Sequence, residues 1–181
     1  MIAQSKPKET IIDTKAEITY HQLYEFGKLF ECNQLSLQML NNSFDPELNR
    51  EQAFESGEGS GKSGSFFFLT HDKKFMIKTI NASELKIMLN ILPSYIKHHL
   101  KYTDSLISKI FGVFTVRRQG MSPVILCLME NTVQLKNPEM LRYKFDLKGS
   151  THGRKASGVI TSKTDRKDID FIDLKTKEIK K

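Results

Sequence analysis

The sequence predicts an α+β fold, in which an antiparallel sheet has helices packed against it. Two pairs of short β-prone runs are each joined by a few polar residues, which is typical of hairpins. Segments with apolar residues at helical spacing precede the first pair and separate it from the second. Because hairpins pair antiparallel, helices between them are expected to cover one side of the resulting sheet.

The first half of the chain supplies two of these features. Residues 1–19 are expected to form a loose N-terminal segment, since their first part is polar. From Tyr20 to about Leu40, apolar residues recur three and four positions apart, which predicts one or two helices. Residues 65–80 read SFFFLT, HDKK and FMIKTI, which predicts a hairpin whose strands flank a polar turn.

The second half continues the alternation. Residues 82–102 are expected to form a helix that Ser83 caps and that Pro93 breaks or kinks. Residues 111–129, FGVFTVRRQGMSPVILCLM, predict a second hairpin that turns near Gly120. The segment KFDLKGS, residues 144–150, is a third β-prone run that leads into a loop.

Charge is concentrated at the end of this 181-residue chain, whose formal net charge is +7. Residues 1–135 hold 15 basic and 14 acidic residues, whereas residues 136–181 hold 13 basic and 7 acidic ones. Such an excess favours phosphate, an acidic membrane surface or nucleic acid as a partner. We expect no nucleic acid, because Phe171 is the only aromatic residue after Phe145. For the last residues, LKTKEIKK, we expect instead a solvated, partly disordered tail.

Other classes of protein are disfavoured by patterns that the sequence lacks. No apolar run approaches the roughly 18–20 residues of a membrane-spanning helix. The start, MIAQSKPKET, has no apolar centre of a signal peptide. Cys32 and Cys127 form neither a disulfide framework nor a metal-binding pattern. We therefore expect a cytoplasmic chain with no metal ligands of its own.

Residues 57–64 are rich in glycine and admit several interpretations. GEGSGKS nearly matches the Walker A pattern, but a Walker A loop lies between a strand and a helix, and β-prone FFFL follows here. The same flanks disfavour a dinucleotide-binding turn, which opens a helix. A glycine-rich loop between two strands is the protein-kinase arrangement, in which it covers the nucleotide phosphates. A plain Gly/Ser linker stays open as an alternative.

Lys78 interrupts the apolar run FMIKTI, fourteen residues after Gly64. This is the placement of the kinase strand lysine, which neutralises nucleotide phosphates. Glu84 is the only acidic residue between Asp72 and Asp104, so it is the natural carboxylate partner on the following helix. The alternatives are a solvent-facing Lys78 and a Glu84 that serves only the helix dipole.

The segment DLKGS carries an acid and a base two positions apart. If the strand extends through it, Asp146 and Lys148 lie on the same face. They are then either an acid that positions a phosphate-binding cation or a surface ion pair of little weight. Arg154 and Lys155 follow closely, so the region is either a phosphate site or an ordinary basic loop.

Taken together, five segments resemble the phosphatidylinositol phosphate kinases of the phosphatidylinositol-4-phosphate 5-kinase type: GKSGSFFFLTHDKKFMIKTI, LNILPSYIKHH, SLISKIFGVFTV, ILCLMENT and FDLKGSTHGRK. The resemblance covers residues 20–155, which it implies are the N-terminal lobe of the kinase domain. KDIDFI, residues 167–172, is similar to a family segment shortly beyond. Residues 156–181 would then be a basic tail at the start of a second lobe that the sequence lacks.

The resemblance implies ATP-dependent phosphorylation of a phosphatidylinositol phosphate at an acidic membrane surface, with Mg²⁺ as the metal ion. It implies an ATP-binding role for a set of residues: Gly61, Lys62, Ser63, Gly64, Ser65, Lys78, Met129, Glu130 and Asn131. In this set Lys78 is the ATP lysine, with Glu84 as its partner, and the last three residues form a hinge beside adenine. Asp146 and Lys148 would face the reaction centre as catalytic residues, and Arg154 would shape the lipid-binding side.

Part of the family pattern is not in the sequence. The family carries its catalytic aspartate in a D-Y-S-L-L segment and its magnesium-binding aspartate later, and neither these nor the basic specificity loop occurs here. We therefore expect a fragment that does not transfer phosphate by itself. The alternative is a non-catalytic half-kinase that binds acidic membranes or a partner kinase. A peripheral location at the plasma membrane or another acidic membrane is expected, as is pairing of two copies through their N-terminal lobes.

Overall fold

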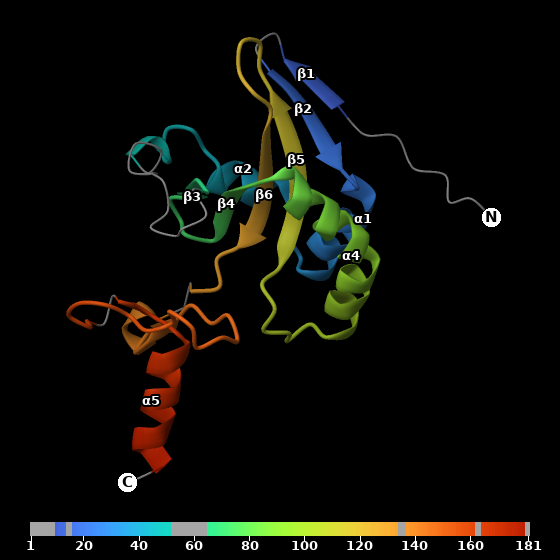
Figure 1. Cartoon of the computed structure of the whole chain (residues 1–181). Coiled ribbons are helices and arrows are strands. Elements are labelled where there is room, and N and C mark those ends of the chain that lie inside the picture. The colour runs from blue at the N-terminus through green and yellow to red at the C-terminus, as the bar shows by residue number, and fades with distance from the viewer. Residues whose placement is uncertain (1–9, 14–15, 52–64, 134–136, 162–163, 180–181) are drawn as a thin grey trace. The chain divides into compact units, whose positions relative to one another are not determined.

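The computed structural model describes residues 10–13, 16–51, 65–133, 137–161 and 164–179 (Figure 1). The chain divides into two compact units, Met1–Thr132 (unit 1) and Val133–Lys181 (unit 2).

Unit 1 is built on a six-stranded antiparallel sheet in the order β1-β2-β5-β6-β4-β3. Its strands are β1 (Thr10–Asp13), β2 (Ala16–His21), β3 (Phe67–Leu69), β4 (Phe75–Ile80), β5 (Ile110–Arg117) and β6 (Val124–Glu130). Both predicted hairpins are confirmed, since β3 pairs with β4 and β5 pairs with β6. The second one turns where predicted, at Gly120, whose φ of 79° suits a residue without a Cβ.

In the described part of unit 1, the helices α1 (Leu23–Cys32), α2 (Leu37–Ser43) and α4 (Ala82–Lys101) accompany this sheet. The segment from Tyr20 to Leu40 thus contains two helices, within the expectation of one or two. α1 packs against α4 and against β5, as Figure 1 shows. The predicted α+β class is confirmed.

The core of unit 1 lies between these helices and the sheet. It consists of Phe26, Leu29, Phe75, Met88, Leu92, Ile96, Phe111, Val113 and Cys127. The helical members recur three or four positions apart, so that each helix turns one apolar stripe inward. β5 alternates between buried and partly exposed residues, as a strand with one buried face should.

Residues 10–13 and 16–19 differ from the loose segment that is predicted for residues 1–19, whereas residues 1–9 lie outside the described part of the chain. β1 and β2 form a hairpin, and β2 pairs along its length with β5. Side chains reinforce this pairing: a ring nitrogen of His21 lies 2.8 Å from Thr115 Oγ1, and Arg117 Nη1 donates to Thr19 Oγ1 at 3.1 Å. Pairing with a neighbouring strand, which is a tertiary effect, thus decides the structure of this segment.

The long helix differs from the prediction at two points. Pro93 does not break α4, which continues to Lys101, because Met88, Leu92 and Ile96 bury one face on either side of it. A kink at Pro93 stays a prediction. The N-cap is Asn81 rather than Ser83. The side chain of Asn81 accepts from Glu84 N, and the Glu84 carboxylate accepts from Asn81 N, which forms a capping box.

Unit 2 contains a 3₁₀ turn (Pro138–Met140), the short parallel strands β7 (Lys144–Phe145) and β8 (Asp165–Arg166), and the helix α5 (Asp168–Ile179). The expectation of a disordered end over LKTKEIKK is wrong as far as Ile179, since these residues belong to α5. The Phe145 and Phe171 rings meet edge to face with centroids 5.3 Å apart, so strand and helix share an apolar contact.

The buried His99 gives unit 1 a predicted sensitivity to acid. Its side chain is 2% exposed, and among the described residues neither ring nitrogen has a hydrogen-bond partner. Burial lowers the pKa of His99, and the neighbouring charges of His98 and Lys109 lower it further, although Glu130 opposes them. The unfolded chain therefore takes up this proton first, below about pH 6.5, and stability should fall as the pH falls.

We expect the urea midpoint of the chain to decrease between pH 7.5 and pH 5.5, and this decrease to shrink in His99→Phe. The matched control is His152→Gln, at an exposed histidine, which should keep the full dependence. An unchanged pH dependence in His99→Phe would show that another group is responsible.

Candidate functional site

Lys78 lies in the middle of β4, and the strand register fixes the face to which it belongs. Directly opposed residues of antiparallel strands share a face, and Lys78 opposes Phe67 on β3 and the buried Cys127 on β6. The ammonium lies 5.8 Å from the centroid of the Phe67 ring. Burial raises the pKa of the Cys127 thiol to about 11, so this neighbour is neutral and does not balance the lysine. The charge of Lys78 thus lies on the partly buried face and needs an anion.

Glu84 is the carboxylate that the structure brings to Lys78. Its Oε1 lies 4.0 Å from Lys78 Nζ, while its Oε2 accepts from Asn81 N at 2.8 Å. The glutamate is therefore both a helix-capping residue and an ion-pair partner of Lys78. The sequence presents these two roles of Glu84 as alternatives, and the structure combines them. With 44% of the glutamate side chain exposed, the pair contributes little to stability and leaves the ammonium available to another anion.

Most of the glycine-rich loop lies outside the described residues. Gly61, Lys62, Ser63 and Gly64 belong to this part, so their predicted contact with nucleotide phosphates stays a prediction. Ser65 is described and is 8% exposed. Next to it, Phe66 N donates to Thr79 Oγ1 at 2.9 Å, which aligns the start of β3 with the end of β4.

The predicted hinge, residues 129–131, forms the end of β6 and the residue after it. Glu130 N donates to Lys109 O at 2.8 Å, and Asn131 N donates to Lys74 O at 3.0 Å. Both backbone donors are thus used within unit 1. The predicted hinge role of Met129, Glu130 and Asn131 is therefore limited in one respect. An adenine ring beside this segment would have to form its hydrogen bonds with backbone groups other than Glu130 N and Asn131 N.

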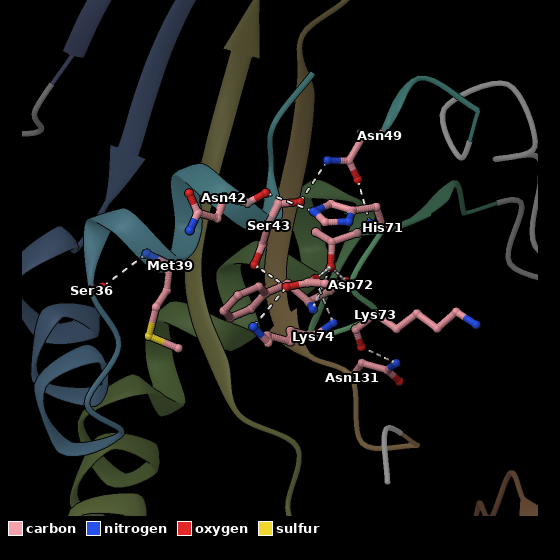
Figure 2. A network of polar contacts seen from close by, with 12 residues as sticks. Ser36, Met39, Asn42, Ser43, Asn49, His71, Asp72, Lys73, Lys74 and Asn131 are labelled. Atoms are coloured by element: carbon pink, nitrogen blue, oxygen red, sulfur yellow. Dashed lines mark hydrogen bonds and ion pairs between the residues drawn. The ribbon is translucent and has the colours of Figure 1, made fainter. Parts of the chain in front are cut away.

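Figure 2 shows a polar network around the turn between β3 and β4, with Asp72 at its centre. The Asp72 carboxylate accepts from Ser43 Oγ and from Thr70 Oγ1, both at 2.8 Å, and forms an ion pair with Lys74 at 3.2 Å. Burial alone would raise the pKa of Asp72, but these hydrogen bonds outweigh it and lower the pKa to about 2. The carboxylate therefore stays charged and links the end of α2 to the turn.

The network extends to the predicted hinge. Asn131 Nδ2 donates to Lys73 O at 2.7 Å, in addition to the backbone bond of Asn131 to Lys74 (Figure 2). On the other side of the turn, His71 N donates to Asn49 Oδ1 at 2.8 Å. The turn after β3 and the end of β6 are consequently held together at the start of β4, three residues before Lys78.

In unit 2 the strand is shorter than expected, and this changes the interpretation of DLKGS. β7 ends at Phe145, so Asp146 and Lys148 lie in a loop and the strand alternation does not apply to them. Asp146 forms an ion pair with Arg154 at 2.9 Å rather than with Lys148. Within the part of unit 2 that the structure describes, the ammonium of the exposed Lys148 has no ion-pair partner.

Arg154 is held by two carboxylates. Its Nε donates to Asp168 Oδ2 at 2.8 Å, and its Nη2 donates to the carboxylate and to the carbonyl oxygen of Asp146. The side chain of Arg154 is 10% exposed. Hydrogen bonds from the Arg154 guanidinium, and from two backbone N–H groups, hold the pKa of Asp168 well below its usual range. The predicted contact of Arg154 with lipid stays a prediction, and any such role would act through the loop that it shapes.

Comparison with known proteins identifies the family. Residues 48–180, more than half of the chain, match the family model described as phosphatidylinositol-4-phosphate 5-kinase. The chain belongs to this family. The predicted resemblance to phosphatidylinositol phosphate kinases is thereby confirmed.

The curated relatives carry the same family name. The chain is 44% identical over 114 residues to phosphatidylinositol 4-phosphate 5-kinase 1 of Arabidopsis thaliana, an alignment that covers 61% of this chain and 15% of that protein. A probable phosphatidylinositol phosphate kinase of Dictyostelium discoideum is 41% identical over 132 residues, covering 71% of this chain and 18% of the relative. The chain thus spans less than a fifth of the length of these lipid kinases.

The sequence patterns give no role to Asp168 and Asp170, which fall in the predicted basic tail of residues 156–181. In the structure they are 7% and 6% exposed and accept hydrogen bonds from distant backbone groups. Two signals could have indicated them: aspartates in the first turn of an amphipathic segment, and their position within KDIDFI.

Two further kinds of feature, metal sites and membrane spans, concern the part of the chain that the structure describes. Among the described residues, no three His, Cys, Asp or Glu side chains gather where they could hold a metal ion. No helix within that part is long and apolar enough to cross a bilayer.

Proposed function

We propose that this chain supplies the ATP-binding sheet and a phosphate-contacting loop of an ATP-dependent kinase that phosphorylates a phosphatidylinositol phosphate. The relatives are named as kinases of phosphatidylinositol phosphates, which supports this substrate class. The observation that carries the proposal is the pairing of Lys78 with Glu84 across β4 and α4, since this lysine–glutamate pair must be in place in active kinases.

The electrostatics of the two units fit phosphoryl transfer. This reaction depends mainly on positioning and on neutralising charge that develops on phosphate oxygens. In unit 1, Lys78 supplies a cation on a partly buried face, where its charge acts more strongly on a nearby phosphate than it would in open water. In unit 2, Lys148 supplies an ammonium that has no ion-pair partner among the described residues, on a loop that backbone and carboxylate contacts shape.

Nucleotide binding tests the proposal directly on this chain. We expect Lys78→Ala to weaken binding of a fluorescent ATP analogue in the presence of Mg²⁺ by about tenfold or more. A hydrogen bond between charged groups contributes about 1.5–3 kcal/mol, and 1.4 kcal/mol corresponds to tenfold in affinity. The matched control is Lys86→Ala, at an exposed lysine of α4, which should bind like the parent chain. Equal losses in both variants would point to non-specific attraction.

We expect no phosphoryl transfer by the 181-residue polypeptide alone, because the aspartate-bearing segments of the family do not occur in its sequence. Incorporation of labelled phosphate into lipid by the pure chain would contradict this expectation.

A groove in unit 1 favours the second candidate, a non-catalytic role at an acidic surface. The groove has a volume of about 420 Å³ and is lined by Glu25, Lys28, Pro93, Ile96, Lys97, Leu100 and Lys101. Three lysines around an apolar floor suit an anionic, partly apolar partner such as an acidic lipid surface. Salt-sensitive binding to phosphatidylserine vesicles, together with ATP-analogue binding that Lys78→Ala leaves unchanged, would favour this role over the kinase proposal.

A further inference from the structure

The loop that follows β7 is held by one carboxylate from a distant part of unit 2. Asp168, the first residue of α5, accepts hydrogen bonds through Oδ1 from Lys148 N at 3.0 Å and from Gly149 N at 2.8 Å. These two amides belong to the DLKGS segment, nineteen and twenty positions earlier in the chain. The backbone of Lys148 is therefore oriented by α5 rather than by a strand.

The same carboxylate also holds the other end of the loop. Its Oδ2 accepts from Arg154 Nε at 2.8 Å, and Ile169 N donates to Arg154 O at 2.9 Å. Arg154 in turn binds Asp146, where the loop begins. One aspartate thus closes residues 146–154 into a ring of contacts, in which every bond to Asp168 involves a charged group and is stronger than a neutral hydrogen bond.

The backbone of the loop is suited to this closure. Gly149 and Gly153 have φ angles of 72° and 64°, in a region that favours residues without a Cβ. Asp168 is 7% exposed and Arg154 is 8% exposed, whereas Lys148 is exposed. The clamp is consequently buried beneath the loop, and the lysine that it orients remains open to solvent.

A neighbouring aspartate secures the flanks of this arrangement. Asp170 Oδ2 accepts from Ala156 N and from Lys167 N, both at 2.9 Å. These contacts fix the chain just after the loop and the chain just before α5. The start of α5 is therefore hydrogen-bonded to the loop and to the residues after it through the buried carboxylates of Asp168 and Asp170.

We propose that Asp168 is a positioning residue for Lys148: by binding the amides of Lys148 and Gly149 and the guanidinium of Arg154, it presents the Lys148 ammonium to a phosphate group. This inference rests on the proposed phosphate-binding role of Lys148. Asp168 itself touches no substrate. Its effect on binding should pass through Lys148 and disappear when that ammonium is removed.

A double-mutant cycle on the full chain tests the coupling, with inositol 1,4-bisphosphate as the probe and chemical-shift titration as the measurement. We expect Lys148→Ala to weaken binding about tenfold and Asp168→Asn about fivefold, while the double variant binds like Lys148→Ala alone. Asp173→Asn is the matched control, because Asp173 lies on the same helix and forms an exposed ion pair with Lys155. This variant should bind like the parent chain.

The outcomes separate the two proposals. If Lys148→Ala binds like the parent chain, the phosphate role of Lys148 fails, and the positioning role fails with it. If Lys148→Ala weakens binding but Asp168→Asn weakens it equally in both backgrounds, or in neither, only the positioning role is overturned.

A second measurement examines the clamp without any ligand. In Asp168→Asn, amide hydrogen exchange at Lys148 and Gly149 should accelerate at least tenfold, with no change in unit 1. If Asp168→Asn unfolds unit 2, Arg154→Lys replaces it, since this variant keeps the cation but cannot bind both carboxylates in the same way. Parent-like exchange at both amides in the folded variant would overturn the proposal.

Discussion

Replacing Phe75 by alanine is expected to lower the free energy of unfolding of unit 1 by about 4 kcal/mol, as is usual for a buried phenylalanine. Phe75 is 3% exposed, and its ring lies 6.0 Å from that of Phe44 and 5.9 Å from that of Phe111. It therefore joins the end of α2 to β5 through the first residue of β4. Urea denaturation followed by circular dichroism measures the loss.

The matched control is Leu106→Ala, since the Leu106 side chain is 99% exposed and its truncation removes no packing. We expect this control to change the free energy of unfolding by less than about 0.5 kcal/mol. A loss below about 1 kcal/mol in Phe75→Ala would mean that the three rings do not form one packed group.

The second large effect is expected at Asp72, where alanine should cost about 2 kcal/mol. The substitution removes the acceptor of the Ser43 hydroxyl, whose residue is fully buried, and an unpaired buried hydroxyl costs about 1–3 kcal/mol. It also removes an acceptor of Thr70 and the partner of Lys74. Urea denaturation at pH 7 checks the value, with Asp104→Ala at an exposed turn as the control.

The same side chain predicts a dependence on pH. The pKa of Asp72 is about 2 in the folded chain, below its ordinary 3.8, so the unfolded chain binds the proton first as the pH falls. The stabilisation is complete above about pH 4 and disappears as the pH falls through 2, with a total of at most about 2 kcal/mol. Asp72→Ala should remove this part of the acid titration. A parent-like titration in the variant would assign the loss to other carboxylates.

Local patterns predicted the parts of the fold that local interactions decide. The runs around HDKK and around Gly120 form the two hairpins, because strand propensity and turn residues act over a few positions. Lys78 and Glu84 come together for a related reason: a short connection from β4 to α4 places the first turn of the helix near the strand.

Long-range pairing explains what the sequence patterns missed. β2 is a strand because it pairs with β5, about a hundred positions later, and β1 in turn pairs with β2. Asp146 and Lys148 would share a strand face if β7 extended through them. Instead they lie in a loop, because Asp146 forms an ion pair with Arg154 and Lys148 N donates to Asp168. No local periodicity encodes a contact between residues 148 and 168.

The hydrogen bonds from DLKGS to Asp168 also determine how short a polypeptide can be while the loop keeps its shape. A polypeptide that ended between residues 155 and 167 would retain every letter of the motif, together with both of its glycines, and would lose the carboxylate that shapes it. A splice variant or proteolytic product that ends in this interval would therefore still contain the motif. It would lack the hydrogen bonds that give the loop its shape. The contacts that shape the DLKGS loop therefore extend to the first turn of α5, eighteen positions beyond the last residue of the motif.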